Sequence, residues 1–168
     1  PWNVSDPSQL KVFAEDDAGN RVELSFVTIF KPYPPRRDTI QVTDAFLESA
    51  VPAISSASPG FDASGSLLDQ YLRINGQMRK ENLAQIAALA DRSEPRLLWS
   101  GPFLQMANSQ RRAGYAEQRS YEYNGKPIDR QTHLGLDLAS TANAPVPAPN
   151  AGKVVLAAFF GIYGNAVI

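Results

Sequence analysis

The sequence THLGLDLA, residues 132–139, alternates polar and apolar side chains. As a strand, it places His133, Gly135 and Asp137 on one face and three leucines on the other. Four residues of ideal strand span about 13 Å, which is long for His133 and Asp137 to meet at one metal ion with bonds near 2 Å. We therefore expect the chain to bend between them, and Gly135 is the residue type best suited to that bend.

Two other interpretations of this stretch are open. A helix would bring His133 and Asp137 together directly at positions i and i+4, but the internal glycine and the proline-rich residues 144–149 make a helix less favourable. The plainer interpretation is a half-buried strand whose polar face meets water. In that case both side chains are merely structural.

Composition excludes several classes of protein. The 168 residues are 43% hydrophobic and 20% charged, which indicates a globular chain. The net charge of -1 gives no electrostatic attraction to nucleic acid, so we expect no nucleic-acid partner. Three basic pairs, Arg36-Arg37, Arg79-Lys80 and Arg111-Arg112, are expected on solvated faces. The chain has no cysteine, and His133 is its single histidine, so a metal site built from this chain alone would be incomplete.

The first 94 residues predict a hairpin, a linker and helices. Residues 10–30 alternate like two strands around a turn at 17–20, with Val22, Leu24, Phe26 and Phe30 on one face. The turn sequence AEDDAGN, residues 14–20, resembles the ending of bacterial immunoglobulin-like modules. Residues 31–35, KPYPP, read as a linker. A short helix is expected from Thr43 to Ala50, ended by Pro52, and a long amphipathic helix or helix pair over 67–90, interrupted near Asn75-Gly76.

The remaining chain predicts strands, at 97–99, at 121–123 before an Asn124-Gly125 turn, and at 154–156. We therefore expect an α+β fold, with a mainly antiparallel β C-terminal half preceded by a helical connector and a short N-terminal β segment. Its predicted divisions are residues 1–35, the end of a β module; 36–94, the helical connector; and 95–168, part of a larger domain. The chain starts PWN without Met and stops on the apolar AVI, and we expect both ends to be cuts. The apolar end is too short and interrupted for a bilayer span, so no transmembrane segment is expected.

Residues 132–168 resemble the first half of the catalytic domain of the lysostaphin-type (LytM-like) zinc metallopeptidases. The family motif H-x-x-x-D matches His133 and Asp137, and a Pro-containing entry to A-x-x-x-G-x-V matches residues 145–154. The motif G-x-Y-G-N-x-V matches residues 161–167, and the upstream RSYEYNGKPIDRQ looks like the family's lead-in strand pair. Four ordered elements over about 37 residues are more specific than the His/Asp pair alone. The resemblance covers roughly residues 95–168.

The resemblance implies a zinc-dependent endopeptidase that hydrolyses peptide bonds in bacterial peptidoglycan, located in the bacterial cell envelope. His133 and Asp137 would be two of three protein ligands to Zn²⁺. In the family, the third ligand is the second histidine of a later H-x-H motif. The first histidine of that motif and another histidine upstream of it assist catalysis. This sequence contains none of them, so no catalytic residue is assigned. We expect residues 1–168 alone to bind zinc weakly or not at all and to hydrolyse nothing.

The main alternative is a non-catalytic peptidoglycan-binding or amidase-regulating LytM-like module. A downstream H-x-H favours the enzyme, and its loss favours the regulator. A regulatory hypothesis adds that a polar residue ahead of His133 covers the metal site in a latent form. On that hypothesis, removal of residues 1–90 from the full-length protein should raise activity.

Overall fold

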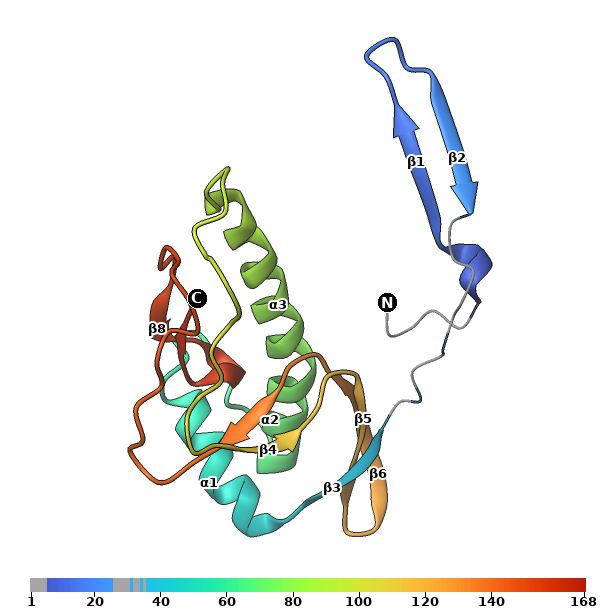
Figure 1. Cartoon of the computed structure of the whole chain (residues 1–168). Helices are drawn as coiled ribbons and strands as arrows, with labels where there is room; N and C mark the ends of the chain where they lie inside the picture. The colour runs from blue at the N-terminus through green and yellow to red at the C-terminus, as the bar shows by residue number, and fades with distance from the viewer. Residues whose placement is uncertain (1–5, 26–30, 32–33, 35) are drawn as a thin grey trace.

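The structure is a computed structural model of the 168-residue chain and describes residues 6–25, 31, 34 and 36–168. It begins with a short 3-10 turn, η1 (Pro7–Gln9), and an antiparallel hairpin of β1 (Lys11–Glu15) and β2 (Arg21–Ser25) (Figure 1). The side chain of Asp16 closes the turn by accepting from the backbone N–H groups of Ala18 and Asn20. The predicted hairpin is thus confirmed, with every residue of both strands exposed. Phe26, Phe30 and most of the predicted linker lie outside the described residues.

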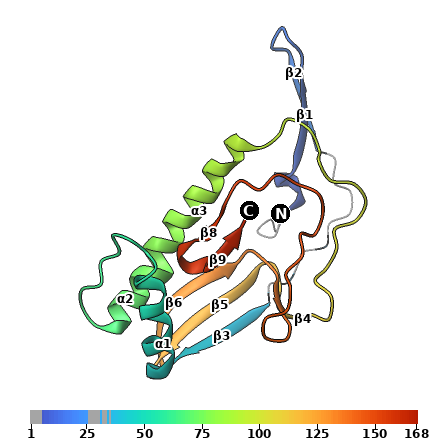
Figure 2. The ribbon, with the colours of Figure 1, turned by 90° about the vertical axis from the view of Figure 1, so that its left-hand side faces the viewer.

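The main sheet has three strands in the order β3-β5-β6, seen side by side in Figure 2. These are β3 (Arg37–Val42), β5 (Glu117–Tyr123) and β6 (Lys126–His133). The strands β5 and β6 are antiparallel, and Asn124 and Gly125 form the predicted turn between them with positive φ at both positions. In contrast, β3 and β5 are parallel, with Arg37 opposite Gln118. A parallel pair needs a long crossover, and residues 43–116 supply it.

Helix α1 (Asp44–Ser55) begins where the Thr43 side chain accepts from the N–H of Phe46. The prediction that Pro52 ends this helix is wrong, because the helix continues through it to Ser55. Proline removes only one intrahelical donor, and Pro52 lies on the exposed side of the last turn. Its own carbonyl still accepts from the N–H of Ser56 at 3.0 Å.

The predicted long helix is confirmed as one continuous helical run. It comprises α2 (Leu67–Arg73), a π-helical turn η2 (Ile74–Met78), α3 (Arg79–Ala88) and a 3-10 turn η3 (Leu89–Arg92). The run begins with a capping box, in which Ser66 and Asp69 exchange side-chain and backbone hydrogen bonds. The predicted interruption at Asn75-Gly76 takes the form of the π-helical turn.

The hydrophobic core lies between this helical layer and the sheet. Its buried members come from β3, α1, α2, η2 and β5, and they are Val42, Leu47, Val51, Tyr71, Ile74 and Tyr121. Burial raises the pKa of the Tyr71 hydroxyl well above its usual range. The core joins residues on both sides of the predicted division at 94–95.

The C-terminal half is mainly antiparallel. It adds the pairs β4 (Gln110–Ala113) with β7 (Asp137–Ala139) and β8 (Ala157–Phe159) with β9 (Asn165–Val167). The 3-10 turn η4 (Gly161–Tyr163) separates β8 from β9. The fold is therefore α+β, as the sequence predicts. No helix among the described residues has the length and apolar character to cross a membrane.

Two predicted strands do not form as expected. Residues 97–99 are not a strand. The chain that follows them makes irregular contacts: the Asn150 side chain donates to Ser100 O at 3.0 Å, and Leu104 N donates to Pro149 O at 2.9 Å. Residues 154–156 are likewise outside β8. The N–H groups of Val155 and Leu156 both donate to the carbonyl of Ile168, so a regular ladder starts only at Ala157.

Candidate metal-binding site at His133 and Asp137

The stretch 132–139 bends sharply at its glycine. Strand β6 ends at His133, the chain bends at Gly135, and β7 begins at Asp137. The neighbouring chain turns at the same place, since β4 ends at Ala113 opposite Asp137 and β5 begins at Glu117 opposite His133. The bend that the sequence predicts is confirmed, and both strands of the ribbon make the corner together.

The neighbouring turn depends on an alanine in an unusual conformation. Ala116 has φ +66° and is fully buried, and its N–H donates to the carbonyl of His133 at 2.7 Å. A non-glycine residue seldom adopts this left-handed region. The hydrogen bond ties the end of β6 to the corner, and so it fixes the backbone that carries His133.

His133 and Asp137 meet across the bend. Nε2 of His133 lies 3.2 Å from Oδ1 of Asp137, and their side chains are 17% and 49% exposed. His133 Nε2 is itself buried and has no partner of hydrogen-bond geometry among the described residues. The two atoms are therefore close in distance without being aligned as donor and acceptor. A Cβ at Gly135 would lie 3.7 Å from His133 Nε2, so the bend also packs directly on the imidazole.

Arg119 and Glu117 support the carboxylate of Asp137 from β5. Arg119 Nη2 donates to Asp137 Oδ2 at 2.9 Å, and Arg119 Nε donates to Glu117 Oε1 at 3.0 Å. Glu117 is buried, and the Arg119 side chain is 19% exposed. Burial by itself lowers the pKa of Arg119, but the hydrogen bonds to Asp137 and Glu117 outweigh it and shift the pKa upward. Arg119 thus remains a fixed cation beside Asp137.

A cleft of about 800 Å³ opens next to this pair. One wall is a face of α3 that carries Arg79, Leu83 and Ile86, and the other is the end of β6 with its bend. Tyr163 of η4 also lines it. His133 and Asp137 both face this space, so a ligand in the cleft would lie against the candidate site.

Helix α3 is fixed to the C-terminal half by Asn82. Its buried side chain accepts from the N–H of Ile162 at 3.2 Å. Gly161 has φ +49°, and a Cβ there would overlap the Asn82 side chain. The first glycine of the G-x-Y-G-N-x-V motif therefore permits close packing of η4 against α3.

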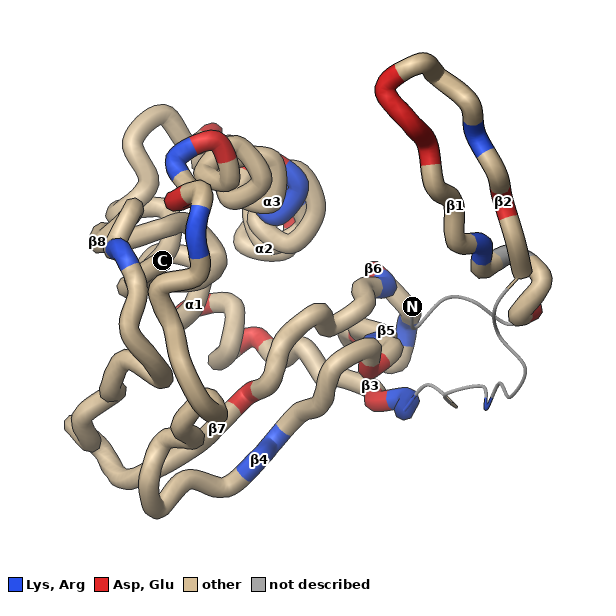
Figure 3. The backbone as a smooth tube through the Cα atoms, turned by 45° about the horizontal axis from the view of Figure 1, so that its top comes forward, with Lys and Arg blue, Asp and Glu red and all other residues tan. Residues whose placement is uncertain are grey.

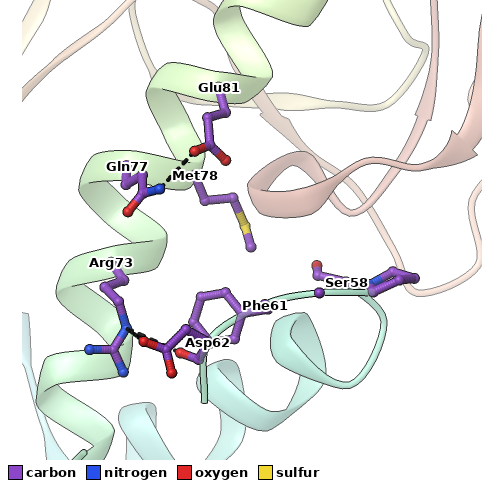
Figure 4. A pocket seen from close by; sticks show the side chains of 9 residues that line it. Ser58, Phe61, Asp62, Arg73, Gln77, Met78 and Glu81 are labelled. Atoms are coloured by element: carbon purple, nitrogen blue, oxygen red, sulfur yellow. Dashed lines mark hydrogen bonds and ion pairs between the residues drawn. The ribbon is translucent and has the colours of Figure 1, made fainter. Parts of the chain in front are cut away.

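A second, smaller hollow of about 200 Å³ lies between the loop after α1 and the long helix (Figure 4). Its charged residues already have partners: Arg73 lies 4.0 Å from Asp62, and Gln77 donates to Glu81 at 2.8 Å. Arg73 also donates to the carbonyls of Asp62 and Ser64. None of the predicted site residues lines this hollow.

The basic pairs do not all match the prediction of solvated faces. Figure 3 shows Lys and Arg on β3, β4 and α3, and acidic residues on β3 and α3 as well. Arg36-Arg37 and Arg111-Arg112 are exposed, as expected. Arg79, however, is partly buried and lines the cleft, because Asn75 holds its guanidinium against the helix.

The sequence prediction missed the supporting residues. Glu117 and Arg119 alternate along β5 and so share one of its faces, but the register that puts Glu117 opposite His133 is a tertiary feature. Within the described residues, no group of three or more Asp, Glu or His side chains is placed to hold a metal ion. His133 and Asp137 are the two candidate ligands that this chain brings together.

Comparisons with known proteins add no family assignment. No protein-family model matches the chain, and no curated protein matches it.

Proposed function

We propose that this chain belongs to a zinc-dependent endopeptidase that hydrolyses peptide bonds in bacterial peptidoglycan, in the cell envelope. In this proposal His133 and Asp137 are two of the three protein ligands, and the third comes from sequence outside residues 1–168. The proposal is supported by the resemblance over residues 132–168 and by the approach of His133 Nε2 to Asp137 Oδ1.

The 3.2 Å separation is the observation that carries the proposal. Two ligand atoms bound at about 2.0–2.2 Å in a tetrahedral site lie about 3.4 Å apart. An imidazole nitrogen and a carboxylate oxygen are both common ligand atoms of zinc in proteins. The buried Nε2, which lacks a hydrogen-bond partner among the described residues, is the kind of atom expected to gain a ligand. The two residues therefore fit zinc in donor type and spacing.

Each residue has a distinct role in this proposal. His133 binds through Nε2 as neutral imidazole, and Asp137 binds through Oδ1. Arg119 holds Oδ2 of the same carboxylate, which keeps Oδ1 directed toward His133, and Glu117 fixes Arg119 in turn. When bound, zinc would polarise a peptide carbonyl and lower the pKa of a bound water molecule to about 7.

The test uses the protein encoded by the whole reading frame. We expect about one zinc per chain by elemental mass spectrometry, together with release of soluble fragments from purified peptidoglycan. His133→Ala and Asp137→Ala should each lose both. Asp91→Ala, which removes an exposed carboxylate remote in sequence from the site, is the matched control and should keep both.

Three outcomes would contradict the proposal. Unchanged zinc content and activity in Asp137→Ala would mean that the pair is structural. A whole protein that binds peptidoglycan without zinc or hydrolysis would favour the amidase-regulating alternative. Hydrolysis by residues 1–168 alone would show that two ligands suffice or that other residues perform the reaction.

A further inference from the structure

Two arginine residues line the cleft beside His133 and Asp137. Arg79 comes from α3 and Arg130 from β6, and both residues line this cleft. The carboxylate that also lines the cleft, Asp137, already lies beside Arg119. Neither Arg79 nor Arg130 forms an ion pair with any carboxylate in the described part of the chain. Within the described residues, neither guanidinium group therefore pairs directly with a carboxylate, and Arg79 is linked to Asp129 through Asn75.

Arg79 is held in place by an amide group. Its Nε donates to the carbonyl of Asn75 at 3.1 Å, and its Nη2 donates to Asn75 Oδ1 at 2.5 Å. Asn75 is 4% exposed and donates through Nδ2 to Asp129 Oδ2 at 2.6 Å. Gln131 donates to the same carboxylate and to the Asn75 carbonyl. This network, built on the π-helical turn, orders the guanidinium while its direct partner stays neutral.

The lining also has apolar side chains beside its polar ones. Leu83 and Ile86 follow Arg79 on the same face of α3, and Leu134 lies at the bend after His133. Guanidinium groups bind carboxylates through paired hydrogen bonds, and the apolar side chains favour small aliphatic groups over water. A ligand that satisfies both is an aliphatic molecule with a free carboxylate.

We infer that Arg79 and Arg130 form a subsite for a carboxylate of a short peptide with small aliphatic side chains. The subsite would position that peptide along the cleft with its chain against His133 and Asp137. Its assignment as a substrate subsite rests on the proposed endopeptidase function, whereas its ability to bind a carboxylate does not require zinc.

The experiment is a binding titration of residues 1–168 in the presence of EDTA, followed by NMR. The probe is N-acetyl-alanyl-alanine with a free C-terminal carboxylate, and the matched probe is the same dipeptide with a C-terminal amide. The reporters are the imidazole signals of His133, which are unambiguous because the chain has one histidine, and the amide signals of residues 130–135. We expect the free acid to shift these signals in a saturable way and the amide to bind at least tenfold more weakly.

The variants Arg79→Gln and Arg130→Gln should each weaken binding of the free acid about tenfold, with little effect on the amide. The control is Arg112→Gln, an exposed arginine of β4 that does not line the cleft, and it should bind like the wild type. Because Arg79 is part of a buried network, its variant is used only if its amide spectrum stays folded. Arg130 is exposed, so the Arg130→Gln result stands without it.

Equal binding of the acid and the amide would overturn the inference, and so would unchanged affinity in Arg130→Gln. Binding of inorganic phosphate as tight as that of the dipeptide would show that the aliphatic part of the peptide contributes nothing. That result would also overturn the assignment to a peptide. Carboxylate binding that persists while the whole protein contains no zinc would keep the subsite and refute the endopeptidase. Zinc-dependent hydrolysis without selectivity for the carboxylate would support the endopeptidase and refute the subsite.

Discussion

Arg119 Nη2 lies 2.9 Å from Asp137 Oδ2, while Asp137 Oδ1 lies 3.2 Å from His133 Nε2. The two oxygens of one carboxylate thus have different neighbours, a permanent cation and an imidazole. Glu117 holds the same guanidinium from the other side. The orientation of Asp137 is consequently set by β5 as well as by its own strand.

Replacing Arg119 tests this support. Arg119→Gln should lower the free energy of unfolding by about 2 kcal/mol, because it leaves the buried carboxylate of Glu117 without its donor. The double variant with Glu117→Gln should recover part of that loss, since neither side chain is then charged. Urea unfolding measures the stability of the single and the double variant. The control is Arg112→Gln, which should change the free energy of unfolding by less than about 0.5 kcal/mol. An equal loss in the single and double variants would show that the two residues are not coupled.

Gly161 provides a test of the packing between α3 and η4. Gly161→Ala should destabilise the chain by about 2 kcal/mol, because the new methyl group overlaps the Asn82 side chain and φ is +49°. The matched control is Gly152→Ala, where a Cβ would meet no atom within 4 Å, and it should be close to neutral. Thermal or urea unfolding of the two variants checks this. A Gly161→Ala variant as stable as Gly152→Ala would mean that η4 does not pack on α3 in this way.

The capping box at the start of α2 predicts an acid-dependent loss of stability. A hydrogen bond from the Ser66 side chain, and to a smaller extent one from the Ser66 backbone, lowers the pKa of Asp69 below its ordinary value of 3.8. Since the folded-state pKa lies below the unfolded one, the carboxylate contributes stability that is present above about pH 4 and lost as pH falls through the folded value. Asp69→Asn should therefore be less stable than wild type at pH 7, and the gap should close toward pH 2.

The measurement is the free energy of unfolding of both proteins across that pH range. Asp62, whose pKa is also lowered, is common to wild type and variant, so its effect cancels in the difference. A gap that does not change with pH would show that the Asp69 charge contributes nothing to the cap.

Truncation separates the hairpin from the core. Residues 36–168 contain all six buried core residues, whereas removal of residues 1–90 deletes five of them and leaves only Tyr121. We expect residues 36–168 to keep a cooperative unfolding transition by circular dichroism and residues 91–168 to show none. The regulatory hypothesis is therefore tested by removing residues 1–35, since the larger deletion would destroy the fold. A stable fold for residues 91–168 would contradict this description of the core.

The bend at Gly135 could be predicted because a simple length argument requires it. Under the hypothesis that His133 and Asp137 bind one metal ion, they are too far apart along an ideal strand, and glycine is the residue between them that permits a corner. The hairpins were predictable for the same local reason, since turn sequences such as Asn124-Gly125 specify their own geometry. The long helix followed from its apolar period.

Other features depend on partners far away in the sequence. The parallel pairing of β3 with β5 brings Thr39 beside Ser120, which no local pattern specifies. The role of Arg119 depends on the register of β5 with β6 and on the bend that returns Asp137 to it. Residues 97–99 have the composition of a strand but find no strand partner among the described residues, which is why the local prediction failed there.

The most direct test is anomalous diffraction at the zinc absorption edge from crystals of the protein encoded by the whole reading frame. The account predicts one strong peak about 2.1 Å from both His133 Nε2 and Asp137 Oδ1, with Arg119 still bound to Oδ2. A zinc peak at other residues would contradict this prediction. The absence of any zinc peak in zinc-saturated crystals, with Asp137 paired only to Arg119 and His133, would contradict it as well.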